Sequence, residues 1–173
     1  MAEFYRERPA GLLPYEEVEM KNIVVSSSNT SADNLMGWIG DGCWPCAFQA
    51  INDTGRIIGM ENTFVGGIYF AAGVYEFQLP IPGIATPANQ MTDYTTHPDP
   101  YFQTTGKDLA KLYTALYQCS KNQGGLLALF PDDFNVENCQ RLIDWLAQVA
   151  DPRILKRGVP DGTLVAHKHG FTN

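Results

Sequence analysis

Apolar side chains recur at helical spacing in several segments of the chain. In the clearest one, which begins after Thr104 or Thr105, they stand at i, i+3, i+4, i+7 and i+8: Leu109, Leu112, Tyr113, Leu116 and Tyr117. This spacing places them on one face of a helix. We predict further helices over residues 14–26, 30–39, 44–51 or on to 57, and 135–150.

Residues 60–104 differ from these helical segments. Glycine and proline interrupt an apolar, aromatic stretch, and five prolines follow between Pro80 and Pro100. Irregular segments of such length usually act as lids or covers. Near the other end, Pro160-Asp161-Gly162 is typical of a turn, and Thr163–His169 is predicted to form a short β-strand. We expect a single domain over residues 1–173, mainly α, with 60–104 as a long irregular cover segment.

Composition narrows the class of protein. The 173 residues are about one domain's worth, and 45% hydrophobic against 18% charged residues excludes intrinsic disorder. The net charge is −7 and no cluster of Lys and Arg stands out, so we expect no nucleic acid partner. The longest uncharged apolar stretch, residues 64–75, is too short for a membrane span of roughly 20 residues. The charged, polar start predicts no signal peptide.

Cys43-Trp44-Pro45-Cys46 matches the C-x-x-C pattern of thiol redox proteins. Such a site needs a preceding strand and a helix whose N-terminus activates the first thiol. Here a glycine-rich turn precedes the pair. The structural interpretation, a cysteine pair buried or bridged at a helix start, is therefore favoured over the redox one. Zinc is disfavoured because no second close pair of Cys or His completes a tetrahedral set. We expect neither a metal nor a cofactor.

Three short motifs occur in order along the chain. The first is Ser27-Ser28-Asn29-Thr30, between two predicted helices, and the second is Gln103-Thr104-Thr105-Gly106-Lys107-Asp108-Leu109-Ala110. The third is Pro160-Asp161-Gly162-Thr163 followed by Val165-Ala166-His167-Lys168-His169-Gly170. They resemble the Ser-Asp-Asn loop, a Thr-Thr-Pro helix start and the Lys-Thr-Gly strand of class A β-lactamases and penicillin-binding D,D-peptidases. The likeness is closest to β-lactamase-like serine hydrolases with Lys-His-Gly, and it spans residues 12–170.

The resemblance implies roles for particular residues. Ser27 would relay a proton to the leaving nitrogen, and Lys168 would supply a positive charge that assists this relay and attracts the substrate carboxylate. Asn29 would hold the substrate's side-chain amide. His169 replaces a carboxylate-binding threonine, and Gly170 would keep the strand edge clear. The parent activity implied is hydrolysis of β-lactams or D-Ala-D-Ala-like peptides.

The sequence departs from this family at the nucleophile. No Ser-x-x-Lys occurs in the chain. Neither Glu61 nor Glu76 has the asparagine four residues later that the deacylating loop of class A enzymes carries. The family's last sheet strands would follow Gly170. We therefore expect a fragment, inactive alone, that comprises the helical subdomain of the β-lactamase/D,D-peptidase fold with a short C-terminal strand.

The resemblance has further implications. The family's extracytoplasmic habit implies an oxidising compartment, in which Cys119 and Cys139 would form a disulfide between neighbouring helices. Such a bridge stabilises by roughly 3 kcal/mol on the loop-entropy estimate. Without the sheet, an apolar helical face and a strand edge would be exposed, which predicts a homo-oligomer.

Simpler interpretations stay open. Ser26-Ser27-Ser28-Asn29 is also a plausible helix-cap cluster. His167 and His169 share one face of the predicted strand and could bind a metal, although a structural or surface role is favoured without a third ligand. The rival function from another class is a non-catalytic binding or interaction module on the same helical scaffold.

Overall fold

A computed structural model describes residues 11–69, 84–91, 99, 101–149, 155 and 158–168. The described chain is mainly helical, as the sequence predicts. Its elements in chain order are α2 (Pro14–Ser26), α3 (Asn29–Ile39), α4 (Trp44–Ile57), β1 (Phe64–Val65), β2 (Phe102–Gln103), α5 (Gly106–Ser120), α6 (Gly125–Leu129) and α7 (Val136–Leu146).

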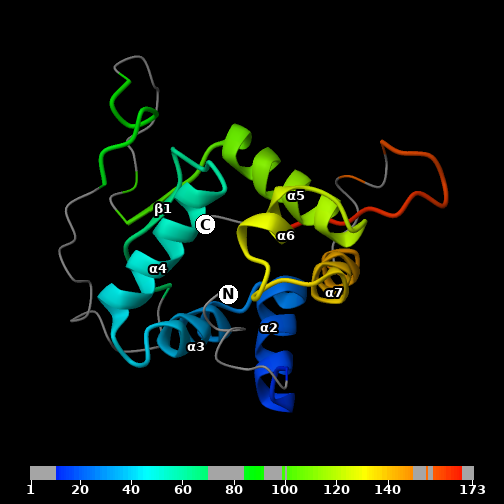
Figure 1. The fold of residues 1–173 in the computed structure, drawn as a ribbon, viewed down its shortest axis with the longest axis horizontal. Helices are drawn as coiled ribbons and strands as arrows, with labels where there is room; N and C mark the ends of the chain where they lie inside the picture. The colour runs from blue at the N-terminus through cyan, green and yellow to red at the C-terminus, as the bar shows by residue number, and fades with distance from the viewer. Residues whose placement is uncertain are drawn as a thin grey trace.

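The helices pack as a series of neighbours. Helix α4 contacts α3, α3 contacts α2, α2 contacts α7, and α7 contacts α5, against which α6 also packs. Figure 1 shows α2 between α3 and α7 accordingly. Helices joined by short turns thus pack against each other. Helix α7 also packs against α2, although more than a hundred residues separate the two helices in the sequence. This packing brings the end of the described chain close to the end of α2.

Three buried clusters hold the helices together. The first joins α5, α6 and α7 through Cys119, Leu126, Phe130 and Cys139. The second joins α2 and α7 through Met20, Leu142 and Trp145, and the third joins α3 and α4 through Met36, Ala47 and Phe48. The predicted disulfide between Cys119 and Cys139 is confirmed, with the two Cα atoms 5.9 Å apart. It lies in the first cluster and joins α5 to α7.

Side chains cap the starts of α5 and α7. The Thr105 side chain accepts a hydrogen bond from the backbone N–H of Asp108. In α7, the Asn135 side chain likewise accepts a hydrogen bond from the backbone N–H of Asn138. A capping side chain satisfies one of the N–H groups that a helix start leaves unpaired. The five-residue helix α6 was not expected from the sequence, and α7 ends at Leu146 rather than near residue 150.

Two corrections concern strands. Antiparallel β1 and β2 pair at the two ends of the cover segment, with Phe64 opposite Gln103, where the sequence predicted irregular chain. The strand expected over Thr163–His169 is absent from residues 163–168. There the backbone lies against α7 instead, and the N–H of His167 donates to the carbonyl of Leu146. The last carbonyls of a helix lack partners within it, so α7 offers an acceptor to a segment that pairs with neither described strand.

Polar side chains fix the described ends of the cover segment. Asn52 on α4 bonds both the N–H and the carbonyl of Val65, at 2.8 and 2.9 Å. The fully buried carboxylate of Asp108 accepts hydrogen bonds from the Asn62 N–H at 2.7 Å and the Thr63 hydroxyl at 3.0 Å. These contacts attach β1 to two helices although the strands themselves are only two residues long.

Candidate functional site

Ser27 closes helix α2 in a left-handed conformation. Its φ is 55° and its ψ is 39°, and the N–H of the next residue, Ser28, donates to the carbonyl of Asn22. Residues other than glycine seldom adopt this conformation, because the Cβ crowds the following carbonyl at a cost of about 1–2 kcal/mol. A serine kept in such a conformation marks a position at which a side-chain function is worth testing.

The serine cluster divides into two roles. Ser28 is the N-cap of α3, where its Oγ accepts hydrogen bonds from the Ser31 N–H at 3.1 Å and the Ser31 hydroxyl at 2.8 Å. The cap interpretation is therefore correct for Ser28. Ser27 is exposed and caps neither helix with its side chain, and Asn29 is exposed as the first residue of α3.

Lys168 reaches Ser27 from the far end of the sequence. Its Nζ donates a hydrogen bond to the Ser27 Oγ, across 141 positions of the chain. The bond between His167 and Leu146 holds the preceding backbone on α7, and His167 is buried. The structure thus brings together Ser27, which the resemblance implies as the proton relay, and Lys168, which it implies as the positive charge that assists this relay.

Tyr113 of α5 adds a third polar group to this site. Partial burial raises the pKa of Tyr113 above its ordinary value and outweighs a hydrogen bond between its hydroxyl and the Lys168 backbone, which acts to lower that pKa. The sequence analysis treated Tyr113 only as a member of an apolar stripe. The sequence feature that could have indicated Tyr113 as a site residue is its hydroxyl within a stripe of leucines. This feature is easily missed because tyrosine also packs as a hydrophobic residue.

Lys168 is exposed, but partial desolvation still changes its acid–base behaviour. Partial loss of water around the ammonium lowers the pKa of Lys168 below 10.5. The group therefore loses its proton more readily than a fully hydrated lysine does. An ammonium next to a hydroxyl can attract an anion, orient that hydroxyl and support proton transfer through it.

Two further residues that the resemblance implies for the site, His169 and Gly170, are outside the described residues, as is Glu76. Glu61 is exposed in the turn before β1. Within the described part of the chain, no group of three His, Cys, Asp or Glu side chains is placed to hold a metal ion.

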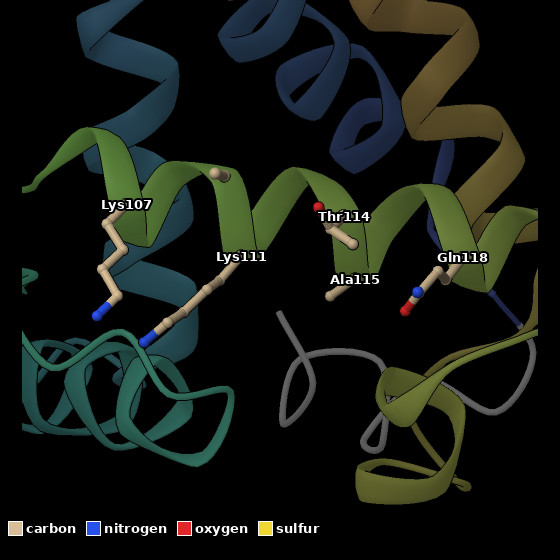
Figure 2. A pocket seen from close by; sticks show the side chains of 6 residues that line it. Lys107, Lys111, Thr114, Ala115 and Gln118 are labelled. Atoms are coloured by element: carbon tan, nitrogen blue, oxygen red, sulfur yellow. The ribbon is translucent and has the colours of Figure 1, made fainter.

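A groove of about 470 Å³ runs along α5, lined by Lys107, Ala110, Lys111, Thr114, Ala115 and Gln118 (Figure 2). Lys111 at one end donates to the Gly59 carbonyl and lies 3.8 Å from Asp108. These lining residues follow i, i+4 steps that place them on another side of α5 from Tyr113. The groove is therefore separate from the Ser27–Lys168 pair.

Cys43 and Cys46 form a second disulfide, with their Cα atoms 5.3 Å apart. Cys43 is the N-cap of α4, and its Sγ accepts the backbone N–H of Cys46 at 3.3 Å. The expected helix start is therefore present, and the pair is bridged there.

Comparisons with protein-family models, with curated proteins and with solved structures found no match to this chain. No helix in the described ranges is both long and apolar enough to cross a membrane. The functional argument therefore depends on the site itself.

Proposed function

We propose that this chain is part of a β-lactamase-like serine hydrolase, in which Ser27 and Lys168 serve the cleavage of an amide beside a carboxylate. The observation that carries the proposal is the hydrogen bond between Lys168 Nζ and Ser27 Oγ. Two residues 141 positions apart were selected by separate motifs, and they meet at one place. A cap cluster alone gives no reason for Ser27 to contact a lysine from the other end of the chain.

The proposed roles follow from the chemistry of the two groups. The Lys168 ammonium attracts the substrate carboxylate and favours proton transfer through Ser27 to the leaving nitrogen. Asn29, two residues after Ser27, binds the substrate's side-chain amide. His169 binds the carboxylate when protonated, and Gly170 leaves room for the substrate. The substrates are β-lactams or D-Ala-D-Ala-like peptides, and the two disulfides suit an extracytoplasmic setting.

The 173 residues alone are expected to bind but not to hydrolyse such a substrate. An acyl-enzyme needs a nucleophile, and the sequence contains no Ser-x-x-Lys. Nitrocefin should not turn over, and mass spectrometry should find no covalent penicillin adduct. Turnover or an adduct would show that these 173 residues contain a nucleophile and would contradict the prediction. If the DNA upstream of the Met1 codon encodes a Ser-x-x-Lys in frame, the joined chain should hydrolyse nitrocefin.

Ligand-observed NMR with benzylpenicillin tests the binding step. The wild-type chain should give saturation transfer, and Lys168→Met should weaken binding about tenfold, because a charge-assisted contact to the carboxylate is lost. Lys107→Met is the matched control, since Lys107 lines the separate groove on α5. No binding by the wild-type chain, or an equal loss in both variants, would overturn the proposal.

The rival function, a non-catalytic binding module, is favoured by the absence of the nucleophile motif from the sequence. It predicts the same carboxylate binding at Lys168. The two proposals differ in the longer chain: a binding module stays inactive toward nitrocefin when the upstream segment is joined, whereas the hydrolase becomes active.

A further inference from the structure

The disulfide between Cys43 and Cys46 lies at the start of a long helix. Helix α4 has 14 residues, Cys43 is its N-cap and Cys46 lies in its first turn. Cys46 is exposed and Cys43 is half-buried. Of the two cysteines, the residue inside the helix is therefore the more exposed, and the cap residue is the less exposed.

The position of Cys43 stabilises a thiolate. Its Sγ already accepts the N–H of Cys46 at 3.3 Å, and the unpaired N–H groups of a helix start carry partial positive charge. A sulfur that receives an N–H bond at a helix N-terminus is a better leaving group in thiol–disulfide exchange. Attack at Cys46 is thus directed by access, and departure of Cys43 is assisted by the helix.

Backbone hydrogen bonds hold this turn in addition to the disulfide. The Gly42 N–H donates to the Gly37 carbonyl at 2.8 Å, the Cys43 N–H to the Gly40 carbonyl at 2.8 Å, and the Ala47 N–H to the Cys43 carbonyl at 3.1 Å. A Cβ at Gly40 would lie 2.2 Å from the Cys43 oxygen, so the turn is closely packed against the helix start. The bridge also closes a loop of only three positions, which constrains the unfolded chain little.

The other disulfide differs in burial and in the length of chain that it closes. Cys119 and Cys139 are fully buried in a core cluster, and their bridge spans 20 positions between two helices. A reductant in solution reaches the first bridge and not the second. The Cys119–Cys139 bridge therefore suits a structural role, whereas the Cys43–Cys46 bridge suits a reaction with a thiol in solution.

We propose that Cys43 and Cys46 form a thiol–disulfide exchange site that accepts electrons from a dithiol. The donor's thiolate attacks the Cys46 Sγ, the S–S bond breaks, and its electron pair leaves with Cys43 as a thiolate. The donor's second thiol, as a thiolate, then attacks the mixed disulfide at the donor sulfur and releases Cys46. The donor becomes a disulfide, the protein becomes a dithiol, and the two protons pass from the donor to Cys43 and Cys46 through water.

The test is timed reduction of the native protein by dithiothreitol, with thiols trapped by iodoacetamide and located by peptide mass spectrometry. Cys43 and Cys46 should be alkylated while Cys119 and Cys139 stay bridged. The folded protein should react roughly tenfold faster than a synthetic peptide of residues 40–50 with the same bridge, because the peptide lacks the helix. Equal rates, or loss of both bridges together, would overturn the proposal.

A second measurement tests the direction of attack. Brief exposure to glutathione, followed by acid quenching, should leave the glutathione adduct on Cys46, and an adduct mainly on Cys43 would contradict the mechanism. The Cys43→Ser/Cys46→Ser variant keeps a capping acceptor at position 43 and should therefore keep the circular dichroism spectrum and unfolding midpoint of the wild-type protein. A variant that fails to fold would show that the bridge is structural, which also overturns the proposal.

Discussion

At the scale of single residues, Ser27 combines an unfavourable backbone with a side chain directed at Lys168. A serine cap could have been replaced by glycine or asparagine at this left-handed position with less strain. The hydrogen bond to Lys168 gives a reason for a hydroxyl here. The serine at position 27 is therefore expected to lower the stability of the fold while supplying the hydroxyl that contacts Lys168.

This cost in stability leads to a direct prediction. Ser27→Gly should raise the free energy of unfolding by up to about 1 kcal/mol, because glycine adopts φ 55° without a steric penalty. The same change at Ser26, the last residue of α2, should lower it by about 0.5–1 kcal/mol, since glycine weakens a helix. Urea denaturation measures both. A loss of stability in Ser27→Gly similar to that in Ser26→Gly would show that position 27 carries no strain.

At the scale of elements, hydrogen bonds from helix side chains hold the small β-sheet in place. Asp108 opens α5 and accepts two hydrogen bonds from the turn before β1, and Asn52 of α4 bonds the backbone of Val65 on β1 itself. The two strands have only two residues each. Their place is therefore fixed by helix side chains rather than by strand pairing.

Asp108 tests this interpretation. Asp108→Ala should lower the free energy of unfolding by about 2–4 kcal/mol, because the Asn62 N–H loses its acceptor and the Thr63 hydroxyl loses one of its two partners, keeping only the Thr104 hydroxyl. Asp53→Ala is the control: Asp53 pairs with Arg56 at the surface and should change stability by less than about 0.5 kcal/mol. If the two variants unfold at the same urea concentration, the buried carboxylate does not hold the turn.

At the scale of the whole molecule, part of the apolar stripe of α5 remains uncovered. Leu116 packs against the core, but Leu109, Leu112 and Tyr117 are exposed, and Leu164 of the C-terminal segment is 68% exposed. Exposed apolar side chains that gather on one element favour association. Because residues 163–168 form no strand, the helical face replaces the strand edge as the expected contact.

We therefore expect the chain to self-associate, most simply as a two-fold dimer. Light scattering at micromolar concentration should give a mass near twice 19.2 kDa. Leu109→Lys/Leu112→Lys should shift the equilibrium to the monomer without unfolding it, because both side chains are already exposed. Thr114→Lys adds a charge on another side of α5 and should leave the dimer intact. A single species near 19 kDa in the wild-type protein would contradict the prediction.

The sequence by itself determined where most helices lie. The spacing of apolar residues and the caps Thr105 and Asn135 are local signals, and local signals suffice because each helix satisfies its own backbone hydrogen bonds. The two cysteines on α5 and α7 were likewise identified from their helices. The strand prediction at 163–169 failed over residues 163–168 because strand formation depends on a partner, which no local pattern can supply.

Only the tertiary structure decided which polar residues meet. The motifs selected Ser27 and Lys168, but their contact depends on α7 returning to α2 and on the bond between His167 and Leu146. The tertiary structure also shows that Ser28 is a helix cap whereas its neighbour Ser27 contacts Lys168, and it places Tyr113 at the same site. Contacts between distant residues depend on the packing of whole helices, so one-dimensional spacing names candidate groups, whereas packing determines which of them can act on one another.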